Sequence, residues 1–169
     1  MKLAPIAWLA ALALFTSCVT SPSGTPATPA PPPKTAQELA GECAAALSDR
    51  DFAKAQTAAA QATQLNPQFE EAWVGFGMAS VRLGQSDLAR AAYGRALELH
   101  QTRRLQAPPD AGQVYQEIFL LSLLGRSAEA DALLKRARAE FPNDPQIITL
   151  SGNFAQIKQT WELWTVKSP

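Results

Sequence analysis

The sequence predicts an all-α fold, an α-solenoid of about three stacked helical hairpins with a C-terminal capping helix. The first observation is a repeat: Leu83-Gly84-Gln85-Ser86 returns as Leu124-Gly125-Arg126-Ser127, and alanines follow both copies at matching positions. A fainter copy, Arg50-Asp51-Phe52, lies 34 residues before Gly84-Gln85-Ser86. The second observation is composition, because Ala, Leu, Gln, Glu and Arg dominate from Thr35 onward and favour helix intrinsically. A period of this length is typical of helical arrays that present a surface to other proteins.

Residues 1–17 are predicted to form a signal peptide. Met1-Lys2 supplies a short positive start, and an uncharged apolar run then extends from Leu3 to Phe15. Thirteen residues match the apolar region of a secretory signal and are too few to cross a bilayer.

The end of that run, Leu14-Phe15-Thr16-Ser17-Cys18, resembles the lipobox of bacterial lipoproteins. Small residues there precede a cysteine that becomes the lipid-bearing N-terminus, although Phe15 departs from the usual leucine. The resemblance implies that Cys18 carries acyl chains, palmitate among them, and several chains anchor a protein stably to a membrane. Val19 after the cysteine favours the outer membrane, facing the periplasm. The alternative is a secreted protein cut nearby, in which Cys18 has no special role.

Residues 18–35 are expected to comprise the lipidated cysteine and a proline-rich tether. Six prolines cluster in it, and proline disrupts helices and sheets alike. They are Pro22, Pro26, Pro29, Pro31, Pro32 and Pro33. At about 3 Å per residue in polyproline conformation, such a spacer would hold a folded domain tens of ångströms from the lipid.

The array itself is expected over residues 36–158, with a C-terminal cap or tail over 159–169. Its helices are predicted at 36–48, 52–65, 70–83, 87–101, 111–124, 128–140 and 145–158. The breaks between them carry turn and capping residues, such as Ser48-Asp49, Asn66-Pro67 and Pro108-Pro109. Helices alternating with short breaks make antiparallel hairpins.

The second hairpin resembles the tetratricopeptide repeat. The signature residues are Trp73, Phe76, Gly77, Ala89, Tyr93 and Ala96. Small residues at Gly77 and Ala89 would let the two helices cross closely. The resemblance implies a right-handed solenoid with units at 36–67, 70–103 and 111–142 and a partial fourth at 145–158. Units one and three match less completely.

Two departures from a regular array have open interpretations. Seven extra residues lie between units two and three, around Arg103-Arg104, and they form either a tolerated loop insertion or a basic contact site. Near the C-terminus, Ile157, Trp161 and Trp164 would share one helix face. They either cap the last exposed apolar surface or bind a partner.

Catalytic, cofactor and metal sites are not expected. Fifteen basic and fifteen acidic residues give zero formal charge, and no basic run is long enough for nucleic acid. His100 is the only histidine, and we expect a solvated residue near a helix C-terminus. Glu70-Glu71 would favour the dipole at a helix start, and Cys43 would be a buried apolar residue. The sequence therefore predicts no enzyme, no cofactor and no small-molecule substrate.

Partner binding is expected on the concave face formed by the first helix of each hairpin, as in tetratricopeptide proteins. Carrying the family positions over gives Ala44, Leu47, Ser48, Glu71, Val74, Met78, Val81, Arg82, Tyr115, Phe119, Ser122, Leu123, Asn153 and Gln156. The asparagines of the chaperone-type carboxylate clamp are replaced by Ala44, Met78 and Phe119. An apolar or amphipathic protein segment is therefore the expected ligand.

The predicted function is a protein-interaction scaffold, a membrane-anchored lipoprotein that helps to assemble an envelope complex. In layout it resembles the tetratricopeptide pilotins of pili and secretion systems, with fewer repeats. An adaptor that docks peptidoglycan enzymes or proteases is the alternative, and an enzyme is the remote one.

Overall fold

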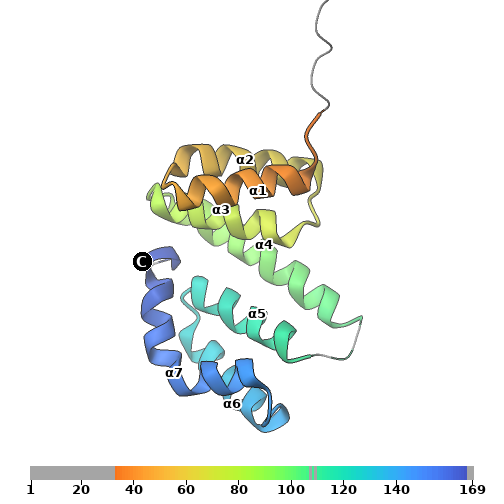
Figure 1. The fold of residues 1–169 in the computed structure, drawn as a ribbon, viewed down its shortest axis with the longest axis vertical. Coiled ribbons are helices and arrows are strands. Elements are labelled where there is room, and N and C mark those ends of the chain that lie inside the picture. Colours follow the sequence, from red (N-terminus) through yellow and green to blue (C-terminus); the bar gives the residue numbers. More distant parts are fainter. Residues whose placement is uncertain (1–32, 107, 109, 167–169) are drawn as a thin grey trace, which may run out of the picture. The chain divides into compact units, whose positions relative to one another are not determined.

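The computed structural model describes residues 33–106, 108 and 110–166. This part of the chain contains seven α-helices, no strand and one short 3-10 helix (Figure 1). The helices are α1 (Ala36–Ser48), α2 (Phe52–Leu65), α3 (Glu70–Arg82), α4 (Ser86–Arg104), α5 (Ala111–Leu123), α6 (Ser127–Glu140) and α7 (Pro145–Trp161), followed by η1 (Glu162–Trp164). The all-α prediction is confirmed.

The helices pack as hairpins that stack on one another. α1 packs on α2, α3 on α4, and α5 on α6, while α2 contacts α3 and α4 contacts α5 between successive pairs. α7 packs against both α5 and α6 (Figure 1). This is an α-solenoid of helical hairpins, as the repeat in the sequence predicts.

Side-chain caps fix where several of these helices begin. Thr35 and Glu38 form a capping box at α1, in which each side chain bonds the backbone N–H of the other residue. Asp51, Asp110 and Asp144 accept backbone N–H bonds at the starts of α2, α5 and α7. The observed starts of these four helices are those that the sequence predicts.

The turns inside the hairpins share one backbone conformation. Gly84 (φ 75°) and Gly125 (φ 73°) are left-handed, and the N–H of each following residue bonds a carbonyl five residues earlier. That pairing satisfies carbonyls left open at a helix end. In the first hairpin Arg50 takes the same conformation (φ 61°) without being glycine. The recurring sequence block is therefore the turn that closes each hairpin.

The core is graded in side-chain size along the array. Around the first hairpin it consists of small residues such as Cys43, Ala55 and Ala59, and around the third of larger ones such as Ile118 and Leu120. Gly77 and Tyr93 mark the closest approach in the second hairpin: a Cβ on Gly77 would lie 2.3 Å from the ring of Tyr93. The predicted close crossing at Gly77 is confirmed.

Two helices run further than the sequence predicts. α4 continues to Arg104, because no proline stops it at Gln101. α7 has a non-helical residue, Asn153 (φ −124°, ψ 19°), where it bends, and it then continues to Trp161. After this bend the chain returns toward α3, which η1 contacts (Figure 1).

The predicted signal peptide, Cys18 and most of the tether lie outside the described residues. Among the helices that are described, none has the length and apolar character needed to cross a membrane.

Candidate protein-interaction face

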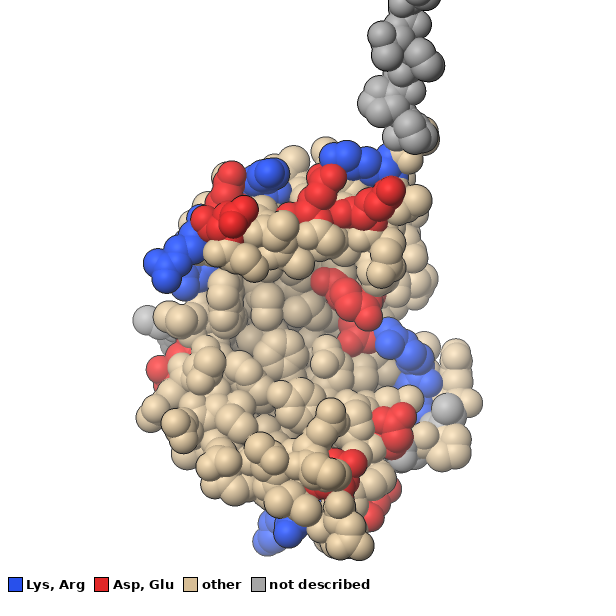
Figure 2. All heavy atoms as spheres, viewed as in Figure 1, with Lys and Arg blue, Asp and Glu red and all other residues tan. Residues whose placement is uncertain are grey.

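The first helices of the hairpins line one side of the array. α1 contacts α3, α5 contacts α7, and η1 contacts both α3 and α7. We call this side the inner face. Figure 2 shows it hollowed, with uncharged atoms in the recess and acidic and basic side chains at its rim.

Most residues predicted to bind a partner are accessible on this side. Those that are exposed are Ala44, Ser48, Glu71, Asn153 and Gln156. Those that are half-buried are Leu47, Val74, Met78, Val81, Arg82, Tyr115 and Phe119. Half-buried apolar side chains are held in place by the core and still present a surface.

Ser122 and Leu123 differ from this expectation, because both are buried. The segment that covers them is the C-terminal arm, by which we mean Trp161–Val166. The N–H of Val166 donates to the carbonyl of Leu123 at 2.8 Å, and the hydroxyl of Thr165 donates to the carbonyl of Ser122 at 3.4 Å. The expectation that these two residues are accessible came from the repeat pattern, which does not show that a C-terminal segment folds back over them.

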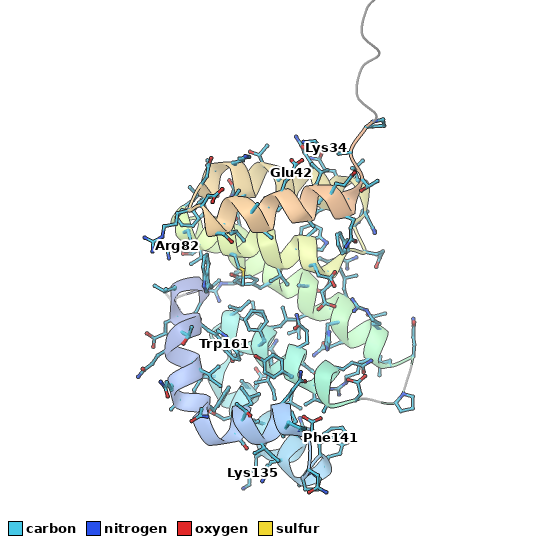
Figure 3. All side chains as sticks on the ribbon, viewed as in Figure 1. Lys34, Glu42, Arg82, Lys135, Phe141 and Trp161 are labelled. Carbon is cyan, nitrogen blue, oxygen red and sulfur yellow. The ribbon has the colours of Figure 1, made fainter. Side chains whose placement is uncertain are left out.

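Trp161 anchors the arm to α5. Its ring meets Phe119 edge-to-face at 5.0 Å between centroids, with Tyr115 and Phe154 at 6.4 and 6.3 Å in similar geometry. Figure 3 labels Trp161 on α7, beside α5. Together with Ile157 and Trp164, it packs against the core that is shared by the second hairpin, the third hairpin and α7. These aromatics thus contact their own array, as a capping element does.

Trp164 anchors the arm to the first two hairpins. The guanidinium of Arg82 lies 4.7 Å from the centroid of Phe52 and 5.4 Å from that of Trp164, within cation–π range of both rings. The two rings are themselves edge-to-face at 6.4 Å. The hydroxyl of Tyr93 donates to the carbonyl of Trp164 at 2.8 Å. The arm therefore bridges hairpins one, two and three.

Two pockets flank α7. One, of about 350 Å³, is lined by Tyr115, Pro145, Gln146, Thr149, Leu150 and Ile157. The other, of about 400 Å³, is lined by Ser122, Ser127, Ala155, Lys158, Gln159, Trp161, Glu162 and Thr165. In the second pocket the hydroxyls of Ser122 and Thr165 donate to backbone carbonyls, and Lys158 pairs with Asp131. The described residues hold no cluster of His, Cys, Asp and Glu suited to a metal.

A buried polar cluster joins hairpins two and three, and it overturns the expectation that His100 is solvated. His100 is 4% exposed; its Nε2 donates to the carbonyl of Gln113 at 2.9 Å, and its Nδ1 lies 3.3 Å from Glu70 Oε1. Glu70, also buried, accepts a 2.6 Å bond from Arg103. Glu70 does start α3, as predicted, but its partners come from α4.

The pKa of His100 reflects these neighbours. Burial acts to lower it, but the Glu70 carboxylate, the Gln113 carbonyl and the charge of Glu117 together raise it above the usual 6.5. The cause is geometric. Nε2–H donates to the Gln113 carbonyl, so in a neutral ring Nδ1 would present its lone pair to the Glu70 carboxylate, which is repulsive. Protonation converts that contact into an ion pair.

Arg103 and Arg104, which one interpretation of the insertion makes a basic contact site, both form ion pairs within the described domain. Arg103 pairs with Glu70, and Arg104 pairs with Glu117, which also accepts a 3.0 Å bond from Gln101. Both arginines thus neutralise glutamates at the seam between hairpins. Glu117, at a position where the repeat usually has an apolar residue, is buried with these partners.

Cys43 is buried, as predicted, with 2% of its surface exposed. Burial raises the pKa of its thiol to about 11. A thiol with that pKa is almost fully protonated at neutral pH and is a weak nucleophile.

No protein-family model matches the chain, and no curated protein matches it. Among solved structures it is similar to a chain of the "CopN-Scc3 complex", at 22% identity and a TM-score of 0.48, covering 72% of this chain and 68% of that chain. A similarity of this size assigns no function. The tetratricopeptide character of the repeats stays a resemblance carried by residues such as Trp73, Gly77 and Tyr93.

Proposed function

We propose that this protein is a non-enzymatic scaffold that binds a segment of another protein on its inner face. The observation that carries the proposal is a set of half-buried apolar side chains on α3 and α5, two of the first helices that line the inner face. They are Val74, Met78, Val81, Tyr115 and Phe119. The recess of that face is uncharged at its centre (Figure 2). Apolar surface of this kind, rimmed by polar residues, is where protein partners dock.

The chemistry of the recess favours an apolar or amphipathic segment. Met78 supplies adaptable contact, and Tyr115 and Phe119 supply large rigid rings. Glu71 is exposed, so a basic residue on the polar side of the partner would find a counter-charge. Arg82 is engaged with two aromatic rings and offers little to an acidic partner.

We further propose that the scaffold is a lipoprotein held in a bacterial envelope by Cys18. It would face the periplasm from the outer membrane and assist assembly of a pilus or secretion complex. The lipobox-like sequence supports this. Labelling with a clickable palmitate analogue tests it: Cys18→Ala should lose the label and leave the membrane fraction. Retention of both in that variant would refute the lipid anchor, with Cys43→Ala as the matched control that keeps them.

Photo-crosslinking in the native cell tests the binding face. A photoreactive residue at Met78 or Phe119 should capture one partner, identified by mass spectrometry. The same residue at Lys135, exposed on α6, should capture none. Equal capture from both sides, or none from the inner face, would refute the proposal.

The identity of the captured protein separates the candidate roles. A secretin or pilus component supports envelope assembly, whereas a peptidoglycan enzyme or protease supports the adaptor. If the purified protein shows catalytic activity, and a single polar substitution abolishes it, the scaffold proposal is refuted in favour of an enzyme.

A further inference from the structure

We infer that the C-terminal arm is an intramolecular ligand of the inner face, displaced by a partner segment with an aromatic residue followed two positions later by a β-branched aliphatic one. The inference rests on the proposed function, since it names the partner segment that the same face would bind.

The arm lies where a partner is expected. Trp161 packs on Tyr115 and Phe119, Trp164 contacts Arg82, and the residues after it bond the carbonyls of Ser122 and Leu123. The contacted residues come from α3 and α5, the two helices that carry most of the predicted face.

Two of the bonds that hold the arm involve its main chain. Tyr93 donates to the carbonyl of Trp164, and the N–H of Val166 donates to the carbonyl of Leu123, each at 2.8 Å. Between them Thr165 is extended (φ −79°, ψ 136°). Any extended peptide can make main-chain bonds of this kind, so these groups can receive a segment of another protein in the same way.

The side chains supply the selectivity. The ring of Trp164 packs beside Phe52 and Arg82, and Val166 is 1% exposed. Leu163, in the same segment, is 61% exposed and contributes no comparable contact. The face is thus selective for an aromatic residue and for the aliphatic residue two positions later. It makes no selective contact with the residue before the aromatic one.

The arm covers only part of the inner face, so a partner segment that covers more of this face can displace it. An attached ligand acts at an effective concentration in the millimolar range, so a short free peptide competes poorly with it. A partner that also covers Val74 and Met78 on α3 gains contacts that the arm does not make.

The test uses a fluorescent peptide, Glu-Leu-Trp-Thr-Val, which repeats residues 162–166, and the full chain in detergent. The variant Trp164→Ala/Val166→Ala weakens the arm and leaves the receiving residues intact. Anisotropy should show at least tenfold tighter peptide binding to this variant than to the wild type. Leu163→Ala is the matched arm control and should behave as the wild type.

Specificity is tested with a peptide in which tryptophan is replaced by alanine, and with the receiving variant Tyr93→Phe. Either change should lower binding to the weakened-arm chain at least threefold. Equal binding to wild type and arm variant, or no binding to a variant whose circular dichroism shows native helix, overturns the inference. If the double variant is unfolded, Trp164→Phe provides the same comparison, with an expected increase of twofold or more over wild type.

The crosslinking experiment separates this inference from the proposed function. In cells, Trp164→Ala should raise partner capture from Met78 at least twofold. Capture that is present but unchanged refutes only the displacement by a partner, whereas absence of capture in every variant refutes the scaffold.

Discussion

The hydroxyl of Tyr93 in α4 donates a 2.8 Å hydrogen bond to the carbonyl of Trp164, 71 residues further along the chain. The same tyrosine ring packs against Gly77, so one side chain serves both the crossing of a hairpin and the seating of the arm. It is fully buried, and burial raises the pKa of its phenol well above the usual value. The phenol therefore stays neutral and keeps its donor at physiological pH.

Tyr93→Phe should lower stability by about 1 kcal/mol, because it removes this bond and leaves the ring packing unchanged. A loss of that size corresponds to a fall of about 2–4 °C in Tm for a domain of this length. Thermal unfolding by circular dichroism measures it. Tyr115→Phe, at a half-buried tyrosine on α5, is the control and should leave Tm within a degree; an equal fall in both variants would contradict the assignment.

Gly77→Ala should destabilise the second hairpin by about 1–3 kcal/mol, the usual range for overpacking. The added Cβ would meet the ring of Tyr93 at 2.3 Å, and a fully buried ring has no room to move. Gly94→Ala is the matched control on α4, because nothing lies within 4 Å of its Cβ. That change should stabilise the helix by up to about 1 kcal/mol. Urea unfolding should therefore show a lower free energy of unfolding than wild type for Gly77→Ala and a higher one for Gly94→Ala.

Arg50→Gly should raise stability by about 1 kcal/mol. Arg50 adopts the left-handed conformation that Gly84 and Gly125 adopt in the later hairpins, and a side chain there is strained. The expected gain is about 2–4 °C in Tm. Asp49→Gly, one position earlier with a right-handed backbone (φ −76°), should instead lower Tm; a gain in that variant would point to a cause other than φ.

Stability should depend on pH through His100. Its folded pKa is raised, so the stabilisation is complete below about 6.5, the value in the unfolded chain, and is lost as pH rises through the folded value. The groups that act on the ring are Glu70 from α3 and Gln113 and Glu117 from α5, and Arg103 from α4 bonds the same Glu70 carboxylate.

The measurement is Tm from pH 5.5 to 8.5 for the wild type and for His100→Gln. The wild type should lose more of its stability across that range than the variant does. Because His100 is the only histidine, the difference between the two curves isolates its contribution. Parallel curves would contradict the pairing with Glu70.

Local sequence determines the helices of this protein well. The starts at Ala36 and Phe52 follow from a Thr–Glu capping box and an aspartate cap, whose chemistry is contained within four residues. The turns at Gly84 and Gly125 follow from glycine at left-handed positions. Such signals need no knowledge of distant parts of the chain.

The contacts between hairpins were harder to predict. His100 lacks any local feature that marks burial, since its partners Glu70 and Gln113 come from other helices. One signal was available: Glu70 lies in the first turn of α3 and Arg103 in the last turn of α4, and these two ends lie side by side in an antiparallel hairpin. The burial of Ser122 and Leu123 depends on where the chain after α7 goes, and repeat positions do not specify that.

The arm also changes how cooperatively the array should unfold. In an open solenoid each hairpin touches only its neighbours, so unfolding can begin at one end and spread unit by unit. Here the contact of Trp164 with Phe52 joins the last segment of the array to the first hairpin, and loss of either end removes support from the other. The described domain should therefore unfold as a single cooperative unit, and release of the arm would return it to the sequential behaviour of an open array.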